Sequence, residues 1–346
     1  MPKRFPSVSG NARILVITSG GTIVQKYDEA NQGYIPKLSG KELFESLSVD
    51  IDLETIELYE YAMIDSRSVD LDFLHGLAKL VQLRIRDEAI DGIVIVHGTD
   101  TMEITAYFLH RTIDSPDKQI VITGSMRVIN NHDYDGRANI SNSIRQACAY
   151  ESTKHAYGVS INFAGNIHSP VHVIKQHSFA VDPFTSGSLF GAIGMIRPNS
   201  IVWLNNPKES LVIPLPSRLQ SVPIVYAFPG ATVDCLDGYA NKFKAIVIVA
   251  YGSGNVNENM YYAIKNVIES GVKVVLVTNC RYGGVYAEYG GLGGNQSLRD
   301  IGVIMADDLN PYQAMTVASL VIGNDKLPPD FPIHVYFKNS ICDLDE

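Results

Sequence analysis

Two short apolar runs, each ending in a glycine–threonine turn, constrain this chain most strongly. Residues 14–17 lead into SGGT with Thr22, and residues 93–96 lead into HGTDT with Thr99. Runs of β-branched residues and leucine bounded by glycine are typical of strands buried in a parallel sheet, and ligands bind beyond the carboxyl ends of such strands. The sequence therefore predicts two threonine hydroxyls at a ligand-binding edge, where a hydroxyl beside glycines can act as an acyl-transfer nucleophile.

The domain organisation follows from length and from one proline-rich stretch. A chain of 346 residues can form two domains that each bury a core. Residues 205–222 are rich in proline, asparagine and serine and have no sustained period, which is typical of a linker. We expect an N-terminal domain over residues 1–204 that carries the threonines, and a C-terminal domain over residues 223–346. Strand-like runs alternate with helical periods in both parts, which predicts an α/β fold with a larger N-terminal parallel-sheet domain and a smaller C-terminal α/β domain.

Charge and hydropathy exclude several classes of function. The net charge is −9, charged residues make up 19% of the chain, and no run rich in lysine and arginine stands out. This argues against a nucleic-acid partner and against a polybasic membrane patch. The N-terminal residues lack the apolar core of a signal peptide, and no stretch of 18 apolar residues occurs. We therefore expect a cytoplasmic protein with no membrane association.

Cysteine and histidine spacing favours neither a metal site nor a disulfide framework. The four cysteines are widely scattered, so we expect them to be reduced. His168 and His172 have the spacing of a helical metal pair, but Pro170 lies between them. We expect no metal ligands and interpret these histidines as structural or surface residues.

The elements around the two turns were predicted from polarity and period. Residues 25–40, directly after Thr22, are polar and predict a mobile loop. Residues 71–88 repeat apolar positions at helical spacing. Asp100 and Glu103 have the spacing of a capping box, which predicts a helix that follows the second run. Residues 119–123 predict another strand, ending at GSMR.

The motifs around the threonines resemble those of bacterial-type L-asparaginases of the cytoplasmic type. Residues 17–23 (ITSGGTI) match the first family signature, and residues 97–103 (HGTDTME) match the second. GSMR at residues 124–127, a following Asp-Gly pair, and GSGNVN at residues 252–257 occur in the expected order. The resemblance covers almost the whole chain. It implies a homo-oligomeric amidohydrolase, a dimer or tetramer, that converts L-asparagine to L-aspartate and ammonia through an acyl-threonine, with no metal or organic cofactor.

The resemblance also implies a first catalytic group. Thr22 would attack the side-chain amide carbon, and Tyr34 would close over the substrate and help to activate the Thr22 hydroxyl. A threonine hydroxyl is a weak nucleophile at neutral pH, so it needs a base, either a desolvated lysine or a tyrosinate. Tyr27 lies in the same polar segment and is the alternative to Tyr34.

A second catalytic group is implied around the HGTDT turn. Thr99, Asp100 and a lysine would form it, and the best-placed lysine is Lys175, with Lys154 as the alternative. Asp100 would bind the substrate's α-ammonium group, although it could also only cap its helix. Backbone N–H groups near Thr22 and Thr99 would supply the oxyanion hole.

Further substrate contacts are less constrained by the sequence. Ser66 would bind the α-carboxylate, and it is followed by Arg67, where the family usually has a small or uncharged polar residue. Arg67 either reaches a substrate carboxylate or pairs with an acidic neighbour on the surface. Asn257 in the second domain is a candidate contact with a neighbouring subunit's site. Which of Tyr286, Glu288 or Tyr289 reaches that site stays open.

Other classes of function were weighed. A dinucleotide-binding oxidoreductase would need GxGxxG after the first strand, and a serine hydrolase would need GxSxG; the chain has neither in place. A glutaminase-asparaginase, a hydrolase of a related amide, and a non-catalytic amino-acid sensor on the same fold are the alternatives to an asparaginase.

Overall fold

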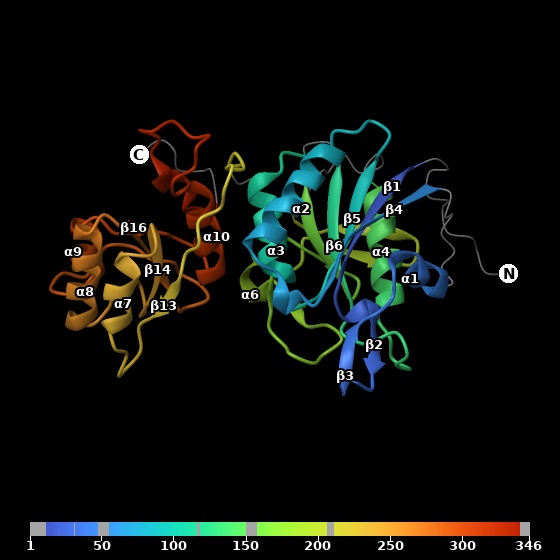
Figure 1. Ribbon diagram of the computed structural model, residues 1–346, viewed down its shortest axis with the longest axis horizontal. Coiled ribbons are helices and arrows are strands. Elements are labelled where there is room, and N and C mark those ends of the chain that lie inside the picture. The colour runs from blue at the N-terminus through green and yellow to red at the C-terminus, as the bar shows by residue number, and fades with distance from the viewer. Residues whose placement is uncertain are drawn as a thin grey trace. The chain divides into compact units, whose positions relative to one another are not determined.

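The computed structural model describes residues 12–47, 55–115, 118–149, 158–205 and 211–339. The chain divides into two compact units, Met1–Pro207 and Lys208–Glu346, and each is described by itself. Each unit is built around its own β-sheet flanked by helices (Figure 1). The predicted α/β fold class is confirmed.

An eight-stranded, mostly parallel sheet forms the centre of the first unit. Five neighbouring strands run parallel, in the spatial order β4 (Ile56–Ile64), β1 (Ile14–Gly20), β5 (Gly92–Val96), β6 (Gln119–Thr123) and β7 (Val159–Phe163). Three short antiparallel strands extend it, β8 (Asn166–His168), β11 (Gly194–Arg197) and β12 (Ser200–Trp203).

Helices cover both faces of this sheet, which is why its inner strands are continuously apolar. On one face α1 (Gly40–Leu47) and α4 (Gly136–Cys148) pack against every second strand residue, such as Val94 and Val96. The residues between these point to the opposite face, because side chains alternate along a strand. There α2 (Leu71–Arg84) and α3 (Met102–Thr112) lie side by side (Figure 1). All residues of β1, β5, β6 and β7 are buried.

The polar segment after Thr22 is a β-hairpin, so the loop predicted there is wrong. Strands β2 (Gln25–Asp28) and β3 (Gly33–Pro36) pair antiparallel. Tyr27 and Tyr34 are opposite each other and their rings meet edge to face, with centroids 5.5 Å apart. An ion pair between Lys37 and Asp28 joins the two sides of the hairpin. These cross-strand pairs supply the side-chain contacts that a reading of polarity alone does not weigh.

Shorter elements connect the main ones in the first unit. They are the 3-10 helices η1 (Thr22–Val24) and η3 (Ser66–Ser68), the two-residue strands β9 (Ile174–Lys175) and β10 (Phe184–Thr185), which pair with each other, and α6 (Gly187–Phe190).

The second unit is a smaller α/β fold. Its four parallel strands are β13 (Ile224–Tyr226), β14 (Ala245–Ala250), β15 (Lys273–Thr278) and β16 (Ile304–Met305). Its helices are α7 (Asp234–Ala240), α8 (Glu258–Glu269), α9 (Asn295–Asp300) and α10 (Pro311–Val321), followed by η4 (Ile333–Tyr336). Helices α7, α8 and α9 share one core with the sheet, and α10 also contacts β14 and β15.

Residues 206–210 of the expected linker lie outside the described residues, and residues 211–222 pack on the second unit. The Ser217 N–H and hydroxyl donate to the Asp325 carboxylate at 2.8 and 2.6 Å. The Asn324 side chain donates to the Pro214 carbonyl at 2.8 Å. The domain limits at residues 204 and 223 stay a prediction.

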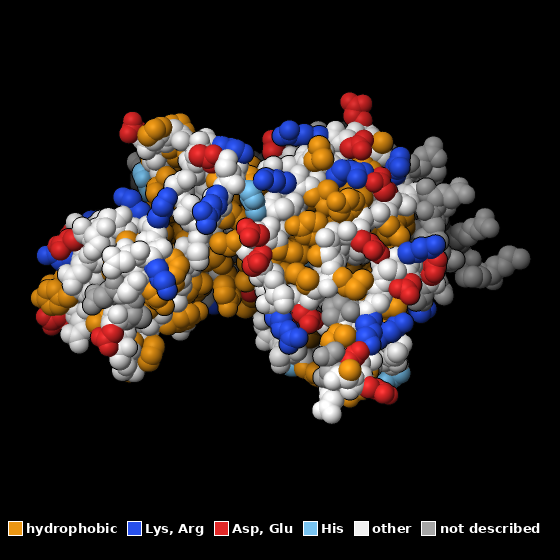
Figure 2. Space-filling model, viewed as in Figure 1, with side chains coloured by type: hydrophobic (Ala, Val, Ile, Leu, Met, Phe, Trp, Pro, Cys, Tyr) orange, Lys and Arg blue, Asp and Glu red, His pale blue; other side chains and the backbone are white. Residues whose placement is uncertain are grey.

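Surface and hydropathy add two facts. On the face shown in Figure 2, lysine and arginine side chains are interspersed with aspartate and glutamate. Within the described part of the chain, no helix has the length and apolar character needed to cross a bilayer.

Candidate active site

Three turns meet at the carboxyl end of the parallel strands. Because β4, β1 and β5 are neighbours, the turns that follow them share one edge of the sheet. Gly21, at φ 84°, lies so close to the turn after β5 that a Cβ on it would be 2.4 Å from the Gly98 Cα. A Cβ on Gly20, at φ 104°, would be 2.3 Å from the Ile64 carbonyl oxygen. Both positions therefore require glycine, and the two glycine–threonine turns press against each other.

Thr22 opens η1 directly after this glycine pair and is half-buried. Among the hydrogen bonds between described residues, none engages its hydroxyl. The hydroxyl is thus placed at the sheet edge without a bond that would have to break before it reacts.

Lys175 joins the second turn from a distant part of the chain. Its Nζ donates to Thr99 Oγ1 at 2.8 Å and to Asp100 Oδ1 at 2.6 Å. The Lys175 side chain is 14% exposed and that of Asp100 is 65% exposed, whereas Thr99 is 5% exposed. The structure thus brings Thr99, Asp100 and Lys175 into one cluster that faces solvent through the carboxylate. Lys154 lies outside the described residues.

The capping box predicted for Asp100 and Glu103 is wrong. Helix α3 begins at Met102 with Thr101 as its N-cap and has no side-chain cap bond. The Asp100 carboxylate is engaged by Lys175 Nζ, and the Glu103 carboxylate accepts the backbone N–H of Lys175. Sequence reasoning missed this contact of Glu103, although the residue stands in the second signature. Both acidic residues are therefore used to hold β9 against the turn.

Ser66 ties the turn after β4 to the turn after β5. It is buried, and its Oγ accepts the Asp100 N–H at 3.2 Å. The Thr101 hydroxyl donates to the Ser66 carbonyl at 2.9 Å. Ser66 thus lies beside Asp100, next to the proposed substrate position.

His97 is a second residue that sequence reasoning did not single out. It is 1% exposed, its Nδ1 lies 2.7 Å from the Gly98 carbonyl oxygen, and its Nε2 lies 3.2 Å from Thr105 Oγ1. Burial lowers the pKa of His97 to about 4. Its place at the head of the HGTDT motif is the signal that pointed to it.

Asp135 holds a further turn, the one that follows β6. Its carboxylate accepts the N–H groups of Met126 and Arg127 at 2.9 Å each. The Asn139 side chain donates to the Gly124 carbonyl at 3.0 Å. Burial raises the pKa of Asp135 in spite of these bonds. This explains why GSMR and the later Asp-Gly pair belong to one structural unit.

Tyr34 and Arg67 lie at the exposed side of the site. Tyr34 is 49% exposed and contacts Tyr27, and the structure does not bring it into contact with Thr22. The Arg67 guanidinium donates to Asp65 Oδ2 at 3.0 Å. The other oxygen of Asp65 accepts Gln25 Nε2 at 2.5 Å, which ties the base of the hairpin to the same carboxylate.

The candidate residues of the second unit have structural partners there. Asn257 is the N-cap of α8, and its Oδ1 accepts the Met260 N–H at 2.9 Å. Tyr286 and Tyr289 are exposed, and the N–H groups of Glu288 and Tyr289 donate to Asn295 Oδ1 at 2.7 Å each.

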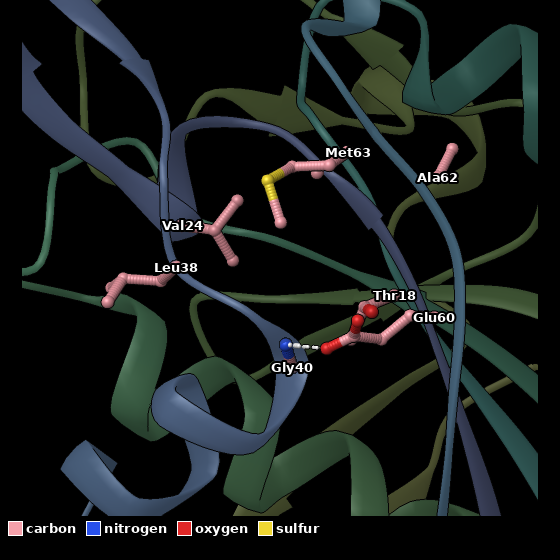
Figure 3. A pocket seen from close by; sticks show the side chains of 8 residues that line it. Thr18, Val24, Leu38, Gly40, Glu60, Ala62 and Met63 are labelled. Atoms are coloured by element: carbon pink, nitrogen blue, oxygen red, sulfur yellow. Dashed lines mark hydrogen bonds between the residues drawn. The ribbon is translucent and has the colours of Figure 1, made fainter.

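A separate pocket of about 230 Å³ opens at the edge of the sheet between β1, β4 and the segment after the hairpin (Figure 3). In it, the Glu60 carboxylate accepts the Gly40 N–H at 2.6 Å. The lining residues are Thr18, Gly20, Val24, Leu38, Gly40, Glu60, Ala62 and Met63. None of them is a predicted catalytic residue, so the pocket lies beside the cluster around Lys175. No group of three or more metal-binding side chains occurs among the described residues.

Comparison with known proteins places this site in a family. Residues 13–209 match the asparaginase N-terminal model and residues 221–331 the glutaminase/asparaginase C-terminal domain. The fold resembles the crystal structure of a probable cytoplasmic L-asparaginase from Campylobacter jejuni, with TM-score 0.80 and 30% identity over 94% of this chain and 99% of that one. An L-asparaginase of Bacillus licheniformis is 29% identical over 91% of this chain and 97% of its own length. A probable periplasmic L-asparaginase of Haemophilus influenzae is 28% identical, over 94% and 92%. The chain belongs to the asparaginase family of amidohydrolases, so the resemblance seen in the motifs is confirmed.

Proposed function

We propose that this protein hydrolyses the side-chain amide of L-asparagine to L-aspartate and ammonia through an acyl-threonine on Thr22. The observation that carries the proposal is the contact of Lys175 Nζ with both Thr99 Oγ1 and Asp100 Oδ1, beside the Thr22 turn. A buried hydroxyl, an amine and a carboxylate in one cluster are the groups that proton transfer and recognition of an amino acid require.

The reaction divides into two steps. In the first, Thr22 Oγ attacks the amide carbon, its proton passes to a base, and the protonated amine leaves as ammonia while the ester forms. Tyr34 as a tyrosinate, or Lys175 in its neutral form, serves as that base. In the second step, a water positioned by Thr99 attacks the ester, and Thr22 leaves with a proton. These steps use acid–base and nucleophilic chemistry of the chain's own residues, so we propose no metal or organic cofactor.

Substrate recognition rests on the turn residues around Asp100. Its carboxylate is 65% exposed although it pairs with Lys175, so one side is available to an α-ammonium group. Ser66 lies against the Asp100 N–H and is the proposed contact for the α-carboxylate. Arg67, held by Asp65, is the proposed additional contact only for a substrate with a second carboxylate.

The test is ammonia release from a panel of L-asparagine, L-glutamine, D-asparagine and acidic amide analogues. We expect L-asparagine to have the highest kcat/KM. A preference for L-glutamine or for an acidic amide would replace the substrate and leave the mechanism, whereas saturable binding without ammonia release from any amide would show an amino-acid sensor.

We also propose that the protein is a homo-oligomer in the cytoplasm. The free cysteines Cys148 and Cys280 support a reducing compartment. If Asn257 of one subunit serves a neighbour's site, mixing Thr22→Ala with Asn257→Ala subunits should restore part of the activity. No recovery, in a mixture where subunit exchange is demonstrated, would show that each site comes from one chain.

A further inference from the structure

His97 is fixed on several sides at the start of the second turn. Its backbone N–H donates to the Thr123 carbonyl of the neighbouring strand at 2.8 Å. Its ring meets Phe73 edge to face at 5.9 Å and contacts the Gly98 carbonyl and Thr105 Oγ1 as described above. Because both ring nitrogens have partners in a buried site, the ring has one orientation that satisfies it.

These partners also define the tautomer of His97. A carbonyl oxygen only accepts hydrogen bonds, so Nδ1 carries the proton and donates to Gly98 at 2.7 Å. Complete burial disfavours the cation, so Nε2 is unprotonated and accepts the hydroxyl proton of Thr105 at 3.2 Å. Thr105, on the first turns of α3, therefore holds the histidine as a donor toward the turn.

This donor sets the direction of the Gly98–Thr99 peptide. The described residues contain no cis peptide bond, so the Thr99 N–H points away from the Gly98 carbonyl. The carbonyl points at the buried ring, and the N–H therefore points out of the core, on the side where Thr99 contacts Lys175. No acceptor among the described residues takes this N–H.

We propose that His97, held by Thr105, is a positioning residue that aims the Thr99 N–H at the oxyanion that forms when the substrate amide is attacked. This deepens the proposed function and rests on it. Donors fixed in advance toward developing charge stabilise the transition state without reorganisation, and removing one such donor typically costs about 10²–10³ in rate. A misdirected donor costs part of this.

Two substitutions of His97 separate its hydrogen bond from its ring. In His97→Asn, the side-chain nitrogen occupies the place of Nδ1 and keeps the bond to Gly98. In His97→Gln, the nitrogen lies nearer the place of Nε2 and the bond is lost. We expect kcat for L-asparagine to fall by roughly 10- to 100-fold in His97→Gln, with KM changed by less than about threefold, since the loss is confined to the transition state. His97→Asn should keep kcat within about fivefold of the wild type. Equal kcat losses in both variants, or none in His97→Gln, would overturn the proposal.

Thr105 provides an independent pair of variants. Thr105→Val removes the donor to Nε2 and should lower kcat several-fold, while Thr105→Ser keeps the hydroxyl and should restore it. If Thr105→Val has wild-type kcat and KM, the histidine does not depend on this bond and the proposed pair is wrong.

A spectroscopic readout separates this proposal from the proposed function. The chain has two glycine–threonine peptides, those of Thr22 and Thr99. Labelling with carbonyl-¹³C glycine and ¹⁵N threonine therefore gives two carbonyl–amide correlations, and Thr22→Ala assigns them. We expect the Thr99 signal to move in His97→Gln relative to His97→Asn, both of which lack the ring, while the Thr22 signal stays. If the wild type released no ammonia, the proposed function would fail and this signal would still test the geometry. An unmoved Thr99 signal in an active enzyme would overturn the positioning role alone.

Discussion

The two threonine turns of this site differ in how firmly they are held. Thr99 is 5% exposed, and its turn is bonded to Lys175, Ser66 and His97. Thr22 is half-buried with an unbonded hydroxyl, and the hairpin that follows it carries Tyr34 at 49% exposure. The structure therefore combines a site half that is preorganised with one that is open in the absence of substrate.

The cause of this difference lies in the sheet. Strand β5 lies between β1 and β6 and is buried along its length, so the turn after it inherits a rigid base. The hairpin has only two strands of four residues each, and isolated two-stranded hairpins are marginally stable in water. Its position is consequently free to depend on what binds beneath it, as expected of a segment that closes over a substrate.

The largest effect is expected from the open half. Thr22→Ala should abolish steady-state ammonia release from L-asparagine, because it removes the attacking oxygen and little buried surface. Thr22→Ser, which keeps a hydroxyl, is the matched control, and thermal unfolding should show that both variants fold. Near-normal turnover by Thr22→Ala would remove the nucleophile from this half of the site.

The preorganised half should respond as one unit. Lys175→Met and Thr99→Val are each expected to lower kcat by several orders of magnitude, and the double variant by much less than the product, since residues that act together are non-additive. Lys154→Met is the control and should retain activity. Multiplicative losses would show separate roles, and damage from Lys154→Met alone would move the lysine assignment.

The hairpin should contribute through one of its two tyrosines. We expect Tyr34→Phe to lower kcat by about a hundredfold, the lower range for a positioned proton-transfer group, while Tyr27→Phe changes it little. Because the rings contact each other, Phe at either position preserves the edge-to-face pair and tests the hydroxyl alone. The reverse ranking would give the catalytic role to Tyr27.

The smallest effect is expected at Arg67. Its guanidinium is 77% exposed and pairs with Asp65, and exposed pairs of this kind contribute about 0–1 kcal/mol. Arg67→Gln should therefore change KM for L-asparagine by less than about fivefold. A rise of about tenfold or more, together with a changed preference for acidic amides, would show that Arg67 reaches the substrate in the closed site.

Sequence reasoning succeeded where burial leaves a simple pattern. The apolar runs at β5 and β6 identified strands because both faces of the sheet are covered. Strand β4 was missed because it is an edge strand on which charged residues such as Glu57 and Glu60 alternate with apolar ones. The hairpin was missed because its pairing depends on cross-strand contacts rather than on burial.

Within the site, local spacing could not reveal contacts between distant segments. Lys175 meets Thr99 only because β9 returns to the carboxyl edge of the sheet, and no periodicity encodes that path; the family resemblance alone pointed to it. Glu103 was misread for the same reason. A capping box is a local pattern, whereas the backbone N–H that this carboxylate accepts lies 72 residues further along the chain.

A partitioning experiment tests the acyl-threonine pathway. With hydroxylamine present, an aspartyl ester on Thr22 divides between water, giving aspartate, and hydroxylamine, giving aspartyl hydroxamate. We predict that the ratio of the two products is the same whether the starting compound is L-asparagine or the β-methyl ester of L-aspartate, because both form the same intermediate. A ratio that changes with the leaving group would contradict a common acyl-enzyme, and with it the assignment of Thr22 as nucleophile.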